Sequence, residues 1–191
     1  MGAVITKAAA ADLPAVAQIY EDIIARQDRG GPYIGWQSGV YPTLETARAA
    51  LERDELFVQR RGEKVVGSAI INQTQVDVYT QAAWQYPAQD SQVMVLHTLV
   101  IDPSESAHGY GGQFAAFYEA YAAQNGCPYL RIDTNARNEV ARKFYKKLGY
   151  REVGIVPCRF NGLPDELPRP PAEGEAGNSG NRTYCACHTF I

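Results

Sequence analysis

Two features between residues 96 and 150 combine residue types and spacings that could do chemistry. The run His108-Gly109-Tyr110-Gly111-Gly112 follows an apolar segment and precedes a helical one, so nearly bare backbone amides would open a helix there. Such a helix start is a ready site for phosphate groups. Asn138 and Tyr145 lie nearly two helical turns apart, which places both side chains on one face of a helix. The pattern predicts a phosphate-bearing cofactor, with coenzyme A as the candidate, beside a phenol that can donate a proton.

The elements that must position these residues follow from hydrophobic periodicity and turn residues. Apolar runs predict strands over 3–7, 56–60, 64–72, 93–101, 129–134 and 151–157. Helices are expected after the capping residues Asp12, Thr43 and Asn138, and from the glycine run to Asn125. Strands alternating with helices indicate the α/β class, and the apolar run over 93–101 is typical of a central strand buried on both faces.

Composition limits the function classes. The chain has 191 residues, of which 46% are hydrophobic, enough for one domain with a substantial core. A net charge of -3 and the lack of a Lys- or Arg-rich run argue against binding to polynucleotides. No apolar segment looks like a signal peptide or is long enough to cross a bilayer. We therefore expect a soluble, cytoplasmic protein with no nucleic-acid or membrane partner.

The end of the chain departs from this pattern. We expect a catalytic domain over residues 1–163 and a flexible tail over 164–191, because 164–182 is rich in proline, glycine and glutamate. Residues 183–191 regain strand character and could complete the sheet or leave its edge open. The compact Cys185-x-Cys187-His188 motif is too short for one tetrahedral metal site, so no metal is expected.

Three segments together resemble the Gcn5-related N-acetyltransferase family over about residues 3 to 160. They are Leu99-Val100-Ile101-Asp102-Pro103, the glycine run, and Asn138-x-x-Ala141-x-x-x-Tyr145-x-x-Leu148-Gly149-Tyr150. The resemblance implies a mixed, mostly antiparallel central sheet flanked by helices, in which two parallel strands splay apart and admit acetyl-CoA. It is an analogy of fold, so the site residues must still justify the chemistry.

The resemblance also implies roles for individual residues. The main chain of the central strand would pair with the pantetheine arm, the glycine loop would hold the pyrophosphate, and Tyr145 would protonate the leaving sulfur. The implied cofactor-binding residues are Leu99, Val100, Ile101, His108, Gly109, Tyr110, Gly111, Gly112, Gln113, Asn138 and Tyr145. Two of them depart from the family pattern: His108 stands where an Arg or Gln contacts phosphate, and Gln113 stands where a small residue is usual. Gln113 could crowd the phosphate or bond to it.

His97 lies two positions before Leu99, where family members often carry a glutamate that relays the proton of the amine. An imidazole can take up a proton in the physiological range, so His97 is the candidate base. The alternative is a hydrogen-bonded core histidine. For the acceptor, aromatic faces could hold a cationic amine. These candidates are Tyr33, Trp36, Tyr41 and Trp84, and the alternative is that they fasten long loops to the core.

The sequence therefore predicts transfer of an acetyl group from acetyl-CoA to a primary amine of a small molecule or protein, by direct attack, with Tyr145 as general acid. The alternative is a non-catalytic acyl-CoA-binding or interaction module with a degenerate cleft. A dinucleotide-binding domain is disfavoured because Phe114 replaces the third glycine of its fingerprint. A homodimer is compatible with the sequence.

Overall fold

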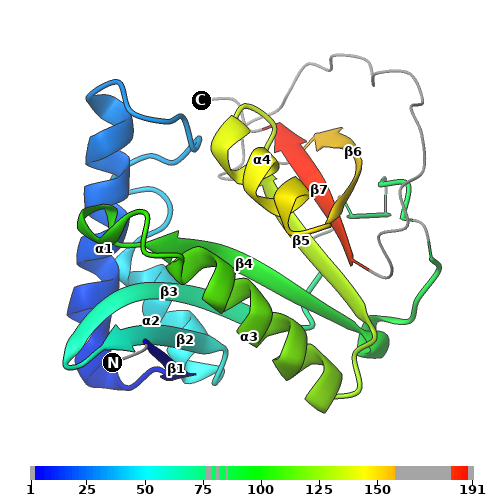
Figure 1. Ribbon diagram of the computed structural model, residues 1–191, viewed down its shortest axis with the longest axis horizontal. Helices are drawn as coiled ribbons and strands as arrows, with labels where there is room; N and C mark the ends of the chain where they lie inside the picture. Colours follow the sequence, from blue (N-terminus) through cyan, green and yellow to red (C-terminus); the bar gives the residue numbers. More distant parts are fainter. Residues whose placement is uncertain (1–2, 76–78, 81, 85, 158–181, 189–191) are drawn as a thin grey trace.

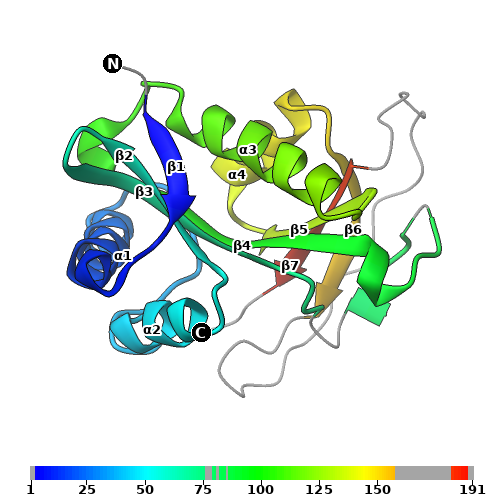
Figure 2. The ribbon, with the colours of Figure 1, turned by 90° about the horizontal axis from the view of Figure 1, so that it is seen from below.

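The computed structural model describes residues 3–75, 79–80, 82–84, 86–157 and 182–188, with 156–157 and 182–188 described by their backbone alone. These residues form a seven-stranded sheet in the order β1-β2-β3-β4-β5-β7-β6. Helices α1 and α2 cover one face of the sheet, and α3 and α4 cover the other (Figures 1 and 2). The predicted α/β class, with a mixed sheet flanked by helices, is confirmed.

The elements lie close to the positions predicted from the sequence. The strands are β1 (Val4–Lys7), β2 (Leu56–Arg61), β3 (Lys64–Asn72), β4 (Val93–Ile101), β5 (Tyr129–Asn135), β6 (Arg151–Pro157) and β7 (Arg182–His188). The helices are α1 (Leu13–Asp28), α2 (Leu44–Glu52), α3 (Tyr110–Gln124) and α4 (Glu139–Lys147). Short 3-10 turns span Ala10–Asp12, Asp90–Gln92 and Pro103–Glu105.

The capping residues behave in two ways. Thr43 Oγ1 accepts from the Thr46 amide at the start of α2, which confirms the predicted cap. Asp12 precedes α1 but makes no side-chain cap to that helix, contrary to expectation. Its carboxylate accepts from the Ala9 amide at 2.7 Å and pairs with Arg60 at 2.5 Å. The carboxylate is thus engaged by the Ala9 amide and by the positively charged guanidinium of Arg60, which adds an ion pair that a helix amide does not offer.

Each face of the sheet carries its own buried cluster. On the α1 and α2 side, the apolar stripe of α1 packs on β2 and β3, and includes Val16, Ile19 and Tyr20. On the α3 side, Phe114 and Tyr118 pack on the central strands. Burying a large apolar side chain stabilises the fold by about 1.5–3 kcal/mol, so both clusters hold β4 firmly between two helical layers.

The parallel pair β4 and β5 separates part of the way along. Their register begins at Val93–Tyr129 and ends at Leu96–Ile132, so β4 from His97 onward has no recorded pairing with β5. On its other edge, β4 remains paired with β3, but with a shift between Ile70–His97 and Ser68–Val100. This bulge adds a residue to β4, and Thr98 within it has a positive φ of 50°. Because a bulge bends its strand, β4 turns away from β5 at this point.

The end of the chain supplies a strand rather than leaving the edge open. Strand β7 lies between β5 and β6 and pairs with both in parallel. The pairings among β1, β2, β3 and β4 are antiparallel. The pairings from β4 through β5 and β7 to β6 are parallel, so the predicted antiparallel character is confined to the half formed by β1–β4. The predicted flexible residues 164–181, and the side chains of Cys185, Cys187 and His188, lie outside the described part of the chain.

Among the described residues, no helix is long and apolar enough to cross a membrane. The cytoplasmic location stays a prediction.

Removal of β7 should destabilise the sheet, because β5 and β6 both lose the backbone partner that β7 provides. A chain ending at Gly162 should melt at least about 10 °C below the full chain, which corresponds to a loss of several kcal/mol. A chain ending at His188 keeps β7 and serves as the matched control. Thermal unfolding followed by circular dichroism measures both, and an unchanged melting temperature for the shorter chain would show that β7 is not part of the folded sheet.

Candidate active site

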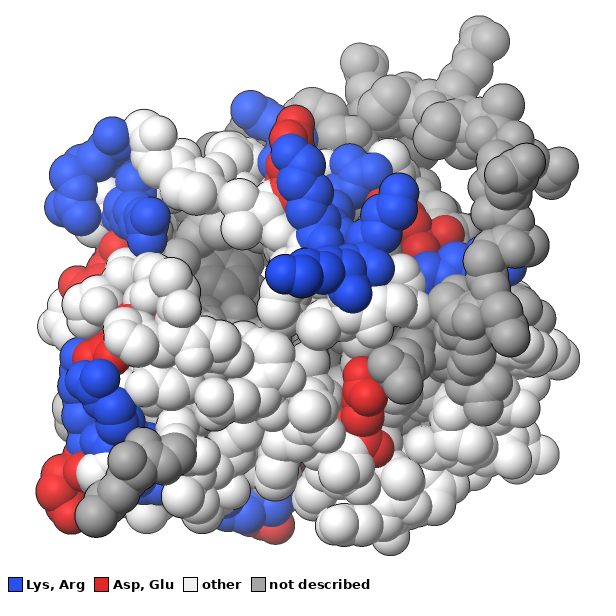
Figure 3. Space-filling model, viewed as in Figure 1, with Lys and Arg blue, Asp and Glu red and all other residues white. Residues whose placement is uncertain are grey.

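A cavity of about 190 Å³ opens where β4 and β5 separate. In Figure 3 the surface is hollowed between α1 and α4, with Lys and Arg side chains on both sides of the opening. The cavity is lined by Ile23, Ile34, Gly35, Trp36, Tyr41, Leu96, His97, Thr98, Leu99, Val100, Ile101, Asp133, Thr134, Asn135, Asn138, Ala141 and Tyr145. The fold thus brings α1, the loop after it, β4, β5 and α4 to one site.

Helix α4 contributes two of the predicted site residues. Asn138 caps α4, since its Oδ1 accepts from the Ala141 amide at 3.0 Å, and it also lines the cavity. Tyr145 is 6% exposed and packs edge-on against Tyr150, with ring centroids 5.8 Å apart. Burial and, secondarily, the negative charge of Asp133 raise the pKa of Tyr145 well above that of a free tyrosine. Its phenol is therefore protonated at neutral pH.

Strand β4 contributes main chain as well as side chains. Leu99, Val100 and Ile101 line the cavity from the part of β4 that has left β5. Val100 and Ile101 keep their partners in β3 on the opposite edge. Backbone amides and carbonyls on the β5 side are consequently open to an extended ligand, which could pair with this edge as a strand would.

The glycine run forms the start of α3, next to the cavity rather than in its lining. Gly109 is the N-cap residue with φ 76°, a left-handed conformation that glycine adopts without strain. A Cβ added at Gly112 would meet nothing within 4 Å, whereas a Cβ at Gly111 would lie 3.3 Å from the Phe144 ring. The open side of the helix start is therefore at Gly112, and Gly111 serves the contact between α3 and α4.

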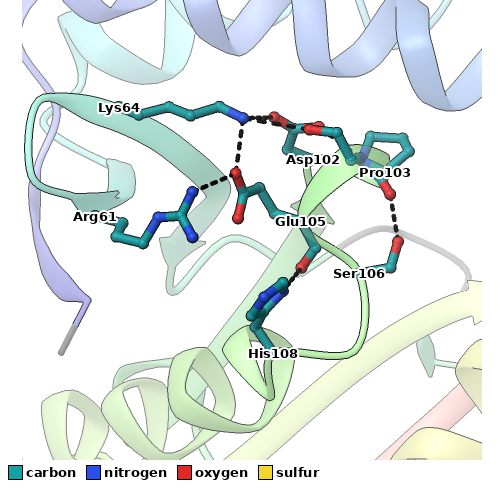
Figure 4. A network of polar contacts seen from close by, with 8 residues as sticks. Arg61, Lys64, Asp102, Pro103, Glu105, Ser106 and His108 are labelled. Atoms are coloured by element: carbon teal, nitrogen blue, oxygen red, sulfur yellow. Dashed lines mark hydrogen bonds and ion pairs between the residues drawn. The ribbon is translucent and has the colours of Figure 1, made fainter. Parts of the chain in front are cut away.

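A network of polar contacts holds the loop between β4 and α3 (Figure 4). The carboxylate of Glu105 is buried and pairs with Arg61 at 2.7 Å and Lys64 at 2.9 Å. Lys64 also pairs with Asp102 at 2.9 Å. Hydrogen bonding from Lys64 is the main cause of a lowered pKa of Glu105, so this carboxylate stays ionised. The β2–β3 hairpin therefore fixes the loop that leads into the glycine run.

His108 and Gln113, the two departures from the family pattern, now have defined contacts. His108 Nδ1 lies 3.1 Å from the Glu105 carbonyl oxygen, so Nδ1 carries a proton and donates it (Figure 4). The neutral ring then presents only a lone pair at Nε2, and a donor appears there when the ring is protonated. Gln113 Oε1 accepts from Gln59 of β2 at 3.1 Å. The side chain of Gln113 is thus turned toward β2.

His97 is 15% exposed, lines the cavity and has its tautomer set by its surroundings. Nε2 lies 3.2 Å from the Thr74 carbonyl oxygen and 3.1 Å from Asn72 Oδ1. The orientation of the Asn72 side-chain amide is fixed by its other contacts: Oδ1 accepts from the Thr74 amide, and Nδ2 donates to the Glu55 carboxylate. Nε2 must therefore carry hydrogen, and in the neutral ring Nδ1 holds the lone pair that can accept a proton.

Sequence reasoning missed a cluster on the far wall of the cavity. Asp133, at the end of β5, lies with its Oδ1 3.6 Å from His97 Nδ1 and accepts from the Tyr79 hydroxyl at 2.8 Å. Thr98 Oγ1 lies 2.6 Å from the Tyr41 hydroxyl. The signal available for Asp133 was its place near the end of the strand that follows α3.

The four predicted acceptor-site aromatics divide into two pairs. Trp36 and Tyr41 line the cavity, with their rings edge to face and 6.1 Å apart. Tyr33 lies under the Arg137 guanidinium at 4.0 Å, and Trp84 packs on Arg131 at 4.2 Å, so neither is among the lining residues. Trp84 also donates to the Tyr79 carbonyl, which fits the alternative that it fastens its loop to the core.

The fold and sequence of this chain have known relatives. Residues 18–150 match the acetyltransferase (GNAT) family, and the chain belongs to that family. It is 33% identical over 66 residues to the uncharacterized N-acetyltransferase YhfO of Bacillus subtilis (strain 168). That match spans 34% of this chain and 44% of the relative, less than half the length of either protein.

Solved structures share the fold at low sequence identity. An N-acetyltransferase from Staphylococcus aureus Mu50 aligns with TM-score 0.57 and 21% identity, over 79% of this chain and 84% of that one. The yncA protein of Salmonella typhimurium, solved with its cofactor acetyl-CoA, aligns with TM-score 0.57 and 15% identity. The alignment covers 79% of this chain and 80% of that one. These similarities confirm the predicted fold.

A side chain at Gly112 should obstruct a phosphate at the start of α3 without disturbing the protein. Gly112→Val should raise the dissociation constant for acetyl-CoA at least about tenfold and leave the melting temperature within a few degrees, since nothing in the protein occupies that space. Ala116→Val, one helical turn further on, is the matched control and should change affinity less than about twofold. Calorimetric titration measures both, and equal affinities would place the phosphate elsewhere.

Tyr41 should make stability depend on pH above 10. Burial raises its pKa to about 12. Below pH 10 the phenol is neutral in the folded and unfolded chains, so its contribution to stability is complete. Between pH 10 and 12 only the unfolded chain ionises it, so the free energy of unfolding falls by up to about 1.4 kcal/mol per pH unit. Urea unfolding of Tyr41→Phe should show a correspondingly shallower slope, and an identical slope would refute the shift.

Proposed function

We propose that this chain is an acetyl-CoA-dependent N-acetyltransferase that transfers the acetyl group directly to a primary amine. One observation carries the proposal: the separation of β4 from β5 creates a cavity that brings Tyr145, His97 and the open edge of β4 together. These supply a proton donor, a proton acceptor and a backbone edge for an extended ligand, which are the groups that acyl transfer to an amine requires.

Acetyl-CoA fits the residues that are present. The open space at Gly112 leaves the amides at the start of α3 accessible to a pyrophosphate, and positive charge gathers at the opening of the hollow (Figure 3). The edge of β4 over Leu99–Ile101 would pair with the amides of the pantetheine arm, with Asn138 facing the same groove. The yncA relative carries acetyl-CoA in its solved structure, which supports the same donor here. When bound, acetyl-CoA supplies the thioester.

His97 is the proposed base for the acceptor. An aliphatic amine enters as an ammonium ion at neutral pH and must lose a proton before its nitrogen can attack. Because Nε2 is committed as a donor to Thr74 and Asn72, the proton goes to Nδ1, which faces the cavity side of β5. Transfer then forms a bond between the amine nitrogen and the acetyl carbon and breaks the carbon–sulfur bond.

Tyr145 is the proposed acid. Its raised pKa keeps the phenol protonated until the sulfur departs. A departing thiolate in the same buried groove is also made more basic by burial, because a low-dielectric environment disfavours either anion. Tyr145 then gives its proton to the sulfur, and its oxygen regains a proton as the new amide nitrogen loses one. No covalent enzyme intermediate is required.

The acceptor is a primary amine of a small molecule or a protein, and a homodimer stays a prediction. The rival function is a module that binds acyl-CoA without transferring the acetyl group. Release of free coenzyme A thiol in the presence of an amine distinguishes the two, because a binding module consumes no thioester.

Replacement of Tyr145 by Phe removes the proton donor while keeping the ring that packs on Tyr150. Turnover should fall about 10- to 1000-fold with little change in acetyl-CoA affinity, as expected for the loss of one general acid. Tyr150→Phe, which changes a neighbouring phenol outside the cavity lining, is the matched control and should stay within about threefold. A free-thiol assay over a panel of amines measures both, and unchanged turnover in Tyr145→Phe would remove it as the acid.

A further inference from the structure

The carboxylate of Asp133 is buried in the cavity wall, and its contacts among the described residues include no Lys or Arg. Its side chain is 10% exposed. Asp133 directly follows Ile132, the last residue of β5 that pairs with β4. Its recorded partners are the Tyr79 hydroxyl at 2.8 Å and His97 Nδ1 at 3.6 Å. Burying an ionised carboxylate is costly unless it is paired, and a single hydroxyl compensates only in part. A cationic group bound beside Asp133 would complete this pairing.

With a neutral His97 ring, no hydrogen lies between Asp133 Oδ1 and His97 Nδ1. Because Nε2 of His97 donates to Thr74 and Asn72, the neutral ring presents the Nδ1 lone pair toward a carboxylate oxygen, and two acceptors face each other. An ammonium group carries three donors and could satisfy both atoms at once. The same carboxylate would then stabilise the imidazolium that forms when Nδ1 takes the proton.

The remaining walls of the cavity are suited to the non-ionic part of a small cationic amine. Trp36 and Tyr41 present aromatic surface, which attracts cations, and Ile23 and Ile34 are apolar. The volume of about 190 Å³ has to hold the end of the pantetheine arm as well, so the acceptor must be compact or reach in with a narrow aminoalkyl chain.

The charges of the cavity argue against a second, negative group on the acceptor. Among the described lining residues Asp133 is the carboxylate and there is no Lys or Arg. A carboxylate beside the amine would face Asp133 with no counter-ion. A neutral oxygen is better matched by Asn135, a residue that is 8% exposed. Its Nδ2 is buried and has no hydrogen-bond partner among the described residues, while its Oδ1 accepts from the Arg137 amide.

We propose that Asp133, with His97, forms an acceptor subsite that binds compact primary amines as ammonium ions and disfavours amines that carry an adjacent carboxylate. The proposal rests on the proposed acetyl transfer for its biological use, but the subsite can be tested by binding alone. Asp133 touches the acceptor directly, and Tyr79 is a positioning residue that holds the carboxylate through its hydroxyl.

Three matched compounds test the subsite on the full chain saturated with coenzyme A, which cannot transfer an acetyl group. β-Alaninamide carries the ammonium and a neutral amide, β-alanine replaces the amide by a carboxylate, and propanamide lacks the amine. Dissociation constants come from ligand-observed NMR titration at pH 7. β-Alaninamide should bind at least about tenfold more tightly than either analogue, the size expected for one charge-assisted contact.

Asp133→Asn keeps an oxygen that can accept from Tyr79 but removes the charge. It should therefore reduce the preference for β-alaninamide over β-alanine, and over propanamide, to within about threefold. Asp22→Asn, an exposed carboxylate on α1 outside the cavity lining, is the matched control and should leave them unchanged. Equal binding of β-alanine and β-alaninamide to the unaltered protein would overturn the proposal without any variant, as would binding of none of the three. A preference for β-alaninamide that survives in Asp133→Asn would also overturn the proposal.

A parallel free-thiol assay with acetyl-CoA separates the two claims. Selective binding of β-alaninamide without thiol release, from it or from any amine of a wider panel, would support the subsite and contradict the acetyl transfer. Thiol release that is equally fast with β-alanine and β-alaninamide would support the transfer and contradict the subsite.

Discussion

The structure depends on the point at which β4 stops pairing with β5. Two parallel strands in the middle of a sheet would ordinarily hydrogen-bond along their whole length and leave no room for a ligand. Here the pairing ends at Leu96–Ile132, and the bulge around Thr98 keeps β4 attached to β3 while it bends away from β5. Helices cover both faces of the sheet around this point (Figure 2). The candidate site is therefore a break in the sheet, formed where β4 bends at its bulge.

The break also explains which side chains meet. Residues just beyond it, His97 on β4 and Asp133 on β5, become the walls of a cavity instead of the interior of a sheet. Helix α4 follows β5 directly, so its cap Asn138 and its buried Tyr145 face the same space. The network around Glu105 anchors the next loop to the β2–β3 hairpin, which fixes the start of α3 relative to β4 (Figure 4). The proposed cofactor side and acceptor side thus both depend on the same divergence of two strands.

Local sequence signals were sufficient for the elements and for the residues that one helix or loop positions. The apolar run over 93–101 and the glycine run fixed β4 and α3, and the seven-residue spacing placed Asn138 and Tyr145 on one face. The pairing of β7 between β5 and β6 could not be derived, because sheet order depends on contacts between distant segments. The contact of Asp133 with His97 and Tyr79 was hidden for the same reason, since three separate segments meet there. Aromatic composition alone could not separate Trp36 and Tyr41, in the cavity, from Tyr33 and Trp84, outside its lining.

The proposed function depends on binding of acetyl-CoA by the open edge of β4 and the start of α3. Amide hydrogen exchange with and without a saturating concentration of coenzyme A tests it most directly, because exchange reports on individual backbone segments. We expect slower exchange over 97–101 and 109–113, with exchange in β1 and β2 unchanged. Slower exchange confined to other segments, or no change anywhere at saturation, would contradict it.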